Sequence, residues 1–120
     1  MKTEVLVLGG GFGRYSAAFR AADLGKQVTL VERFPVFGGV CLNVGCIPSK
    51  TLLHVAKVLN KAKELSPAGI DFLAPDINLQ QLRDWKNKIS AQLNTCSGAL
   101  AKQRNITVIS GNVGFFSRND

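Results

Sequence analysis

The sequence predicts an α/β domain with a parallel sheet, and two observations support this prediction. Short, branched apolar runs at residues 4–10, 27–32 and 105–111 have the length and composition of strands. A segment with helical spacing follows the first run directly after a cluster of glycines and leads into the second run. The order strand, glycine turn, helix, strand within about 30 residues is that of a βαβ unit.

The first half of the chain supplies this unit. "EVLVLGG" (residues 4–10) is almost continuously apolar, so we expect a strand that is buried in the sheet. The next segment, "GRYSAAFRAADLGK", carries alanines that permit close packing of a helix on the sheet, and Gly25 fits the position just past its end. "QVTLVE" (residues 27–32) is expected to form the second strand.

Two longer helices and a third strand are expected in the second half. The first helix follows Pro48 and ends near residues 66–67, with one apolar face formed by Leu52, Val55, Ala56, Leu59 and Ala62. Residues 67–78 are rich in turn residues and indicate a loop. The second helix carries an apolar stripe of Leu82, Trp85, Ile89, Leu93, Cys96 and Leu100. "NITVISG" (residues 105–111) is expected to be the third strand.

Composition and charge limit the class of protein. With 120 residues, 46% of them hydrophobic, the chain has apolar surface for one small globular domain, which a chain of this size buries only marginally. No apolar run reaches the roughly 18 residues of a membrane span, and the N-terminal apolar stretch is too short for a signal peptide, so we expect a cytoplasmic location. The net charge of +7 is scattered along the chain, which indicates a solvated basic surface rather than a nucleic-acid site.

The glycine turn after the first strand, "GGGFGR" (residues 9–14), is the first candidate site. In a dinucleotide-binding fold such glycines make a tight turn and let the backbone approach a pyrophosphate at a helix N-terminus. Glu32 ends the second strand about 20 residues later, where a carboxylate can bind an adenosine ribose. Arg14 stands where a third glycine is typical, so a glycine turn that binds no dinucleotide remains an alternative.

Cys41 and Cys46, five positions apart, are the second candidate site. In a regular helix their Cα atoms would lie roughly 8.7 Å apart, beyond the ~7 Å limit for a disulfide. Gly45 tolerates a distorted turn, and Pro48 favours the first turn of a helix, so a break between the two cysteines would permit the bond. A bond that closes so small a ring in the cytosol is readily reduced, as a catalytic disulfide must be.

Metal binding is the alternative use of these thiols, but it lacks further ligands. Cys96 lies on the apolar stripe of a predicted helix, where we expect a buried structural thiol. His54, the single histidine, is expected to be a partly exposed helix residue, too far along the chain from Cys46 to act on it directly. We therefore predict no metal site.

"GGVCLNVGCIPSK" (residues 38–50), together with "LVLGGG", "YSAAFRAADLG" and "LVER", resembles the N-terminal FAD-binding region of dihydrolipoyl dehydrogenases, in the group of flavin disulfide oxidoreductases. The resemblance runs through essentially all of the chain. It implies an incomplete Rossmann-like FAD-binding domain, with a three-layer arrangement around a parallel sheet. Residues 1–120 would form the N-terminal part of that domain, and the NAD and interface domains would be absent.

The resemblance also implies roles for individual residues. Cys46 would face the flavin, Cys41 would exchange with dihydrolipoamide, and Lys50 would sit beside the flavin ring. The cofactor-binding residues would be Gly9, Gly11, Gly13, Glu32, Arg33, Gly38, Gly39, Cys41, Lys50 and Val113. FAD would be the cofactor, and NAD+ would bind outside this chain. The partners would be dihydrolipoamide on pyruvate and 2-oxoglutarate dehydrogenase complexes and a second subunit of a homodimer, with no nucleic acid and no membrane.

Three departures from the family pattern keep alternatives open. Phe12 replaces a proline, Arg14 replaces the third glycine, and "TCSGAL" replaces a more glycine-rich stretch. The first hypothesis is a dihydrolipoyl dehydrogenase, in which electrons pass from dihydrolipoamide through Cys41 and Cys46 to FAD and then to NAD+. The second is a stand-alone module that binds FAD or a nucleotide without turnover. The third is a truncated, inactive fragment.

Overall fold

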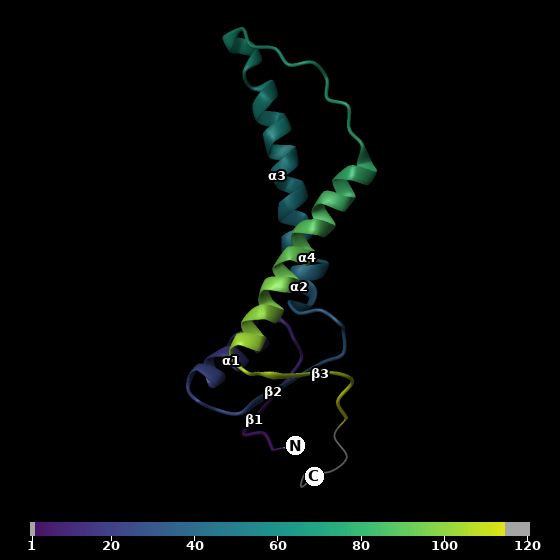
Figure 1. Ribbon diagram of the computed structural model, residues 1–120. Coiled ribbons are helices and arrows are strands. Elements are labelled where there is room, and N and C mark those ends of the chain that lie inside the picture. The colour runs from purple at the N-terminus through teal and green to yellow at the C-terminus, as the bar shows by residue number, and fades with distance from the viewer. Residues whose placement is uncertain (1, 115–120) are drawn as a thin grey trace.

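The computed structural model of the chain describes residues 2–114, and the elements below are those of this region (Figure 1). They are, in chain order, β1 (Val5–Leu8), α1 (Phe12–Asp23), β2 (Val28–Glu32), α2 (Gly39–Asn43), α3 (Cys46–Lys63), the 3-10 helix η1 (Ser66–Ala68), α4 (Leu79–Gln103) and β3 (Thr107–Ser110). All three expected strands and all three expected helices are present. The short helix α2 was not predicted.

The three strands form one parallel sheet in the order β1-β2-β3, which confirms the predicted α/β fold class. In the register of the sheet, Leu30 of the central strand lies between Val7 and Val108. Helix α1 ends as expected, because Leu24 is its C-cap and Gly25 follows with a φ of +81°, a conformation that favours glycine.

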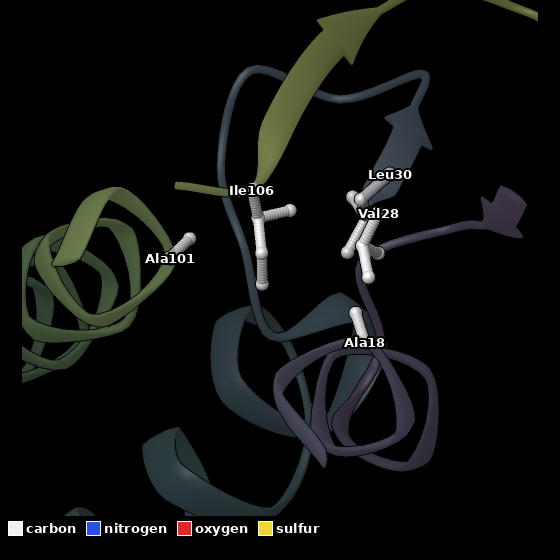
Figure 2. Close-up of a cluster of buried hydrophobic side chains, with 5 residues drawn as sticks. All are labelled: Ala18, Val28, Leu30, Ala101 and Ile106. Carbon is white, nitrogen blue, oxygen red and sulfur yellow. The ribbon is translucent and has the colours of Figure 1, made fainter. Parts of the chain in front are cut away.

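The core lies where α1 and α4 approach the sheet. Its buried residues are Ala18, Val28, Leu30, Ala101 and Ile106. Figure 2 shows Ala18 of α1 directed at Val28 and Leu30, and Ala101 of α4 directed at Ile106. Both helices contribute an alanine to this cluster, so each backbone can come close to the strand residues it packs on. Of the alanines expected to permit close packing of α1, Ala18 is confirmed in the core and Ala21 and Ala22 pack against it, whereas Ala17 is exposed.

The first strand is less buried than predicted. In β1 the side chain of Leu6 is 53% exposed, and all four residues of β3 are exposed, whereas the first three residues of β2 are buried. A parallel strand is buried on both faces only when helices cover both faces of the sheet. Within residues 2–114 the coverage is uneven, so the two outer strands keep exposed apolar side chains.

The expectation of a globular chain is wrong, because α3 and α4 form an elongated arm. The described chain measures 71 × 28 × 21 Å and its radius of gyration is 20.5 Å, against roughly 14 Å for a compact domain of this length. In Figure 1 the two helices cross near α2 and diverge away from the sheet, joined at the far end by residues 64–78. Helices of 18 and 25 residues are about 27 and 38 Å long, so they extend well beyond strands of four or five residues.

The packed face of α4 also differs from the predicted stripe. Trp85, Leu93 and Leu100 are each between 38% and 44% exposed, and Cys96 is exposed, which corrects the expectation of a buried thiol. Ser90 and Ala101 are the buried residues of this helix. The face of α4 that packs on the rest of the chain therefore carries small and polar residues. On this face Asn94 donates a hydrogen bond to Asn43 of α2 (2.7 Å).

Helix α3 begins at Cys46, before the predicted start after Pro48, and Pro48 lies in its first turn as expected. His54 is exposed on this helix. Among the helices of residues 2–114, none combines the length and the apolar composition that crossing a bilayer requires.

Candidate functional site

The glycine turn ties together the ends of β1 and β2 and the segment before α2. The amide of Gly9 donates to the carbonyl of Val31 (2.6 Å), which continues the pairing of β1 with β2. The amide of Gly38 donates to the carbonyl of Gly10 (2.7 Å), and Gly11 and Gly38 form an isolated parallel bridge. The turn that precedes α1 is thereby fixed against the segment that leads to the cysteines.

Glycine is required at some of these positions and leaves the backbone open at another. A Cβ atom on Gly39 would lie 3.0 Å from the Cα of Gly11, and Gly38 has a φ of +93°, so side chains at both positions would disturb the turn. A Cβ atom on Gly11 would meet no atom within 4 Å. The backbone of Gly11, at the N-cap of α1, is therefore accessible to a ligand.

An open groove of about 460 Å³ lies at this turn, between the carboxyl ends of β1 and β2 and residues 111–113. Ligands of open parallel sheets bind at this end of the strands. Six of the residues expected to bind a cofactor line the groove: Gly9, Gly11, Glu32, Arg33, Gly39 and Val113. Four others do not: Gly13, Gly38, Cys41 and Lys50.

The carboxylate of Glu32 is held at the edge of the groove by backbone amides. Its Oε2 accepts from the amide of Gly10 and its Oε1 accepts from the amide of Phe34 (3.0 Å). Partial burial acts to raise the pKa of Glu32, but the hydrogen bonds from the backbone of Phe34, Gly10 and Arg33, with the charge of Arg33, outweigh it and lower the pKa. Glu32 is therefore an ionised acceptor in the groove, with lone pairs left for a ligand hydroxyl.

The predicted break between the two cysteines is present. Cys41 belongs to α2, which ends at Asn43, and Cys46 is the first residue of α3. The two helices meet at Gly45, where a Cβ atom would lie 3.1 Å from the carbonyl oxygen of Val40 and 3.6 Å from the Cα of Cys41. The absence of a side chain at Gly45 thus allows the start of α3 to come against α2.

Asn43 holds the cysteine segment in place, a role that was not predicted. Its Nδ2 donates to the carbonyls of Phe37 (2.8 Å) and Gly39 (2.9 Å), and its Oδ1 accepts from Asn94 of α4 (2.7 Å). One side chain therefore fixes α2 both to the groove-lining segment before it and to the long helix α4. Its position between the two cysteines of residues 38–50 is the feature of the sequence that could have indicated this role.

The pKa of Cys41 depends on the neighbouring thiol of Cys46 and on the charge of Lys50. The pKa of Cys41 is raised, first by a hydrogen bond with the Cys46 side chain and then by desolvation and the charge of Cys46. The backbone amide of Cys46 and the charge of Lys50 act in the opposite direction. Burial, and secondarily the charge of Cys41, raise the pKa of Tyr15 on α1, so Cys41 also lies near that helix. Both cysteines are exposed free thiols.

The pH dependence of alkylation at Cys41 tests this arrangement. Replacing Cys46 with alanine removes the largest cause of the raised pKa, so we expect the midpoint of the alkylation rate at Cys41 to move to lower pH. Replacing Lys50 with methionine removes a cation that favours the thiolate, and the midpoint is expected to move to higher pH. Iodoacetamide labelling of the reduced chain, followed by peptide mass spectrometry, measures both. Lys57→Met is the matched control, and equal shifts in all three variants would contradict the geometry.

The groove and the thiol pair are adjacent parts of one site. Gly39 and Val40 line the groove, and Cys41 follows directly in the same short helix. No group of three His, Cys, Asp or Glu residues that could hold a metal ion occurs within residues 2–114. Cys96 and His54 do not line the groove. The arrangement therefore combines an anionic acceptor, an open helix N-terminus and two neighbouring thiols.

Comparisons with known proteins show what the chain is similar to. The family model described as pyridine nucleotide-disulphide oxidoreductase matches residues 3–115. The chain is 51% identical over 111 residues to dihydrolipoyl dehydrogenase of Vibrio parahaemolyticus, covering 92% of the chain and 23% of that protein. It is 52% identical over 111 residues to dihydrolipoyl dehydrogenase of Haemophilus influenzae, again covering 92% of the chain and 23% of the relative.

A solved structure is also similar. The crystal structure of LpdA from Mycobacterium tuberculosis superposes with a TM-score of 0.81 at 25% sequence identity, covering 92% of this chain and 24% of that one. The chain thus spans about a quarter of the length of the relatives it matches. The resemblance to the N-terminal part of dihydrolipoyl dehydrogenases, drawn from residues 38–50, and the Rossmann-like α/β fold are confirmed.

Proposed function

The chain belongs to the pyridine nucleotide-disulphide oxidoreductase family, and from this premise we propose that it is the N-terminal part of the FAD-binding domain of a dihydrolipoyl dehydrogenase. In this proposal the groove binds the adenosine and diphosphate portion of FAD, and Cys41 and Cys46 form the redox disulfide. The observation that carries the proposal is the continuity of the two parts, because Val40 lines the groove and Cys41 is its neighbour in α2.

The groove suits the nucleotide half of FAD in size and in chemistry. Its volume of about 460 Å³ lies within the range of small-molecule sites. The open backbone of Gly11 and the N-terminus of α1 supply amides and a favourable dipole for the diphosphate. The ionised carboxylate of Glu32 accepts from a ribose hydroxyl, while Arg33 and Val113 line the path of the adenosine.

Other proposed cofactor residues act from outside the groove. Gly38 is buried and bonded to Gly10, so it supports the turn rather than touching the ligand. Gly13 lies in the first turn of α1, where a Cβ atom would meet no atom within 4 Å, and its lack of a side chain keeps the approach to the helix open. The charge of Lys50 acts on the thiolate of Cys41, and Lys50 is proposed to lie beside the flavin ring.

The thiol chemistry proposed for Cys41 and Cys46 is a two-step disulfide exchange. A thiolate of dihydrolipoamide attacks the sulfur of Cys41, the Cys41–Cys46 bond breaks, and Cys46 leaves with the electron pair. The second substrate thiolate then attacks the substrate sulfur of the mixed disulfide, which forms lipoamide and releases the Cys41 thiolate. Two electrons reach the cysteine pair, and the two substrate protons are released. Bound FAD supplies the acceptor for these electrons, which NAD+ finally takes up.

The partners proposed for this chain follow from its family. Dihydrolipoamide would be presented by 2-oxoacid dehydrogenase complexes such as those of pyruvate and 2-oxoglutarate, and the complete enzyme would be a homodimer. The NAD+ site and the dimer interface are proposed to lie in the roughly three quarters of the relatives that this chain does not span. Turnover of dihydrolipoamide is accordingly proposed to need those parts.

Replacing Gly11 with alanine tests the cofactor site. The new methyl group meets no protein atom within 4 Å, and Gly11 has a φ of −69° that other residues adopt readily, so folding is expected to be unaffected. The methyl group stands where the diphosphate approaches the backbone, so the affinity for FAD is expected to fall at least tenfold. Fluorescence titration with FAD measures the affinity, and circular dichroism checks the fold.

Gly98→Ala in α4 is the matched control. It adds a methyl group in equally open space away from the groove, and we expect it to leave FAD affinity unchanged while stabilising the helix by about 1 kcal/mol. Equal FAD affinities for the original chain and both variants would contradict the assignment of the groove.

A further inference from the structure

Arg14 reaches from the first turn of α1 back over the start of the glycine turn. A Cβ atom built on Gly9 would clash with Nη1 of Arg14 and would lie 3.0 Å from Cδ and 3.2 Å from Cζ, so the guanidinium lies directly against the backbone of Gly9. Arg14 also lines the groove, together with Gly9 and Gly11. Its side chain is therefore part of the surface on which a diphosphate would bind.

The charge of Arg14 has no counterion in the described part of the chain. The ion pairs of residues 2–114 join Lys26 to Glu4 (3.1 Å) and Arg104 to Asp23 (2.9 Å), and neither includes Arg14. Glu32 lines the same groove, but among the described residues it forms no ion pair with Arg14. The first turn of α1 contains no acidic residue. The guanidinium is thus available to an anion.

Building on the proposed function, we infer that Arg14 is a diphosphate-binding residue of this chain, which adds a charged contact to the backbone amides of the glycine turn. A guanidinium donates several N–H groups in a planar array that matches two phosphate oxygens. Because Gly11 remains open beside it, the diphosphate can contact the backbone of Gly11 and the guanidinium together. The groove then selects for ligands with a diphosphate over the corresponding nucleosides.

The same position permits an opposite effect, in which the side chain covers Gly9 and excludes a diphosphate. The two effects predict opposite changes in the affinity for a diphosphate ligand when the Arg14 side chain is removed. If Arg14 binds phosphate, removing its side chain lowers the affinity for the ligand. If Arg14 obstructs the turn, replacing it with glycine raises that affinity. Arg14 is exposed, and its side chain takes part in no ion pair within residues 2–114, so it can move aside from Gly9 without breaking one, which favours binding over obstruction.

The test compares ADP with adenosine, which differ in the diphosphate. Isothermal titration calorimetry on the purified chain would give the affinity of both ligands for the original chain, Arg14→Gln, Arg14→Lys and Arg14→Gly. Arg20→Gln is the matched control, since it removes the same charge from the same helix outside the groove. We expect Arg14→Gln and Arg14→Gly to lower the affinity for ADP about tenfold, because each removes a charge-assisted hydrogen bond. Adenosine affinity is expected to stay unchanged in every variant, and Arg14→Lys is expected to retain part of the ADP affinity.

The outcomes separate this inference from the proposed function. Equal or tighter ADP binding by Arg14→Gly, with ADP still bound by the original chain, would overturn the role of Arg14 and leave the groove as a nucleotide site. Binding of ADP by Arg14→Gly alone would mean that Arg14 obstructs the turn, and would overturn the inference in the same way. Failure of every variant to bind ADP, adenosine or FAD while folded would overturn the nucleotide site itself. An equal loss in Arg20→Gln would also overturn the inference, because the effect would then be one of net charge.

Discussion

Replacing Cys46 with serine is expected to abolish formation of the disulfide in residues 38–50 completely. The prediction rests on the position of Cys46 at the start of α3, against Cys41 of α2, with Gly45 allowing the close approach. A disulfide needs both sulfurs, and after the substitution Cys41 has no neighbouring thiol. The measurement is oxidation of the chain with a mild disulfide reagent, followed by peptide mass spectrometry and a count of the remaining free thiols.

Cys96→Ser is the matched control for this experiment. Cys96 is exposed, like the other two cysteines, so the reagent can reach it. We expect Cys96→Ser to form the Cys41–Cys46 bond to the same extent as the original chain. A bond that joins Cys96 to Cys41 or Cys46 within one molecule, or a pair that stays reduced in the original chain, would contradict the proposed redox role.

Replacing Leu30 with alanine is expected to cost about 3 kcal/mol of folding free energy, in the range of large-to-small substitutions in cores. Leu30 is fully buried in the central strand and is the largest such side chain in the described part of the chain. Because a chain of this size has only a small margin of stability, this loss is expected to unfold a large share of the molecules.

Urea denaturation followed by circular dichroism measures this loss. Leu6→Ala is the matched control, since it removes the same atoms from an outer strand where Leu6 is 53% exposed. We expect the control to cost less than about 1.5 kcal/mol. Similar unfolding midpoints for the two variants would mean that the sheet is not organised around Leu30.

Much of the α/β part could be predicted from the sequence, because its signals are local. The strand at residues 27–32 is marked by four consecutive branched residues, Val28 to Val31, and the end of α1 by Gly25. The break between the cysteines could be predicted as well, because a regular helix would hold them too far apart for a disulfide and Gly45 tolerates a distorted turn. Each of these features depends on the chemistry of a few neighbouring residues.

The helical arm could not be predicted, because it depends on contacts between distant segments. Periodicity assigned Trp85 and Leu93 to the packed face of α4, yet both are exposed. The actual contact uses Asn94, whose partner Asn43 is 51 positions away in the chain. A helical pattern shows which residues share a face but does not show what that face will meet.

The candidate site was predicted in part, and the differences have physical causes. The resemblance to the family identified Gly9, Gly11 and Glu32, which line the groove. It also grouped with them Gly38, which is buried and supports the turn. The position of Arg14 over Gly9 could not be deduced, because it depends on how a long side chain folds back over the turn.

We propose that one site of this chain binds FAD and holds the redox pair of Cys41 and Cys46 beside it. The most direct test is to incubate the purified, folded chain with FAD, remove free flavin by desalting, and record the absorbance spectrum before and after adding a dithiol. We predict that flavin stays with the protein and that its spectrum changes on reduction in the original chain but not in Cys46→Ser. A folded chain that elutes without flavin, or a retained flavin that responds to the dithiol equally in both proteins, would contradict the account.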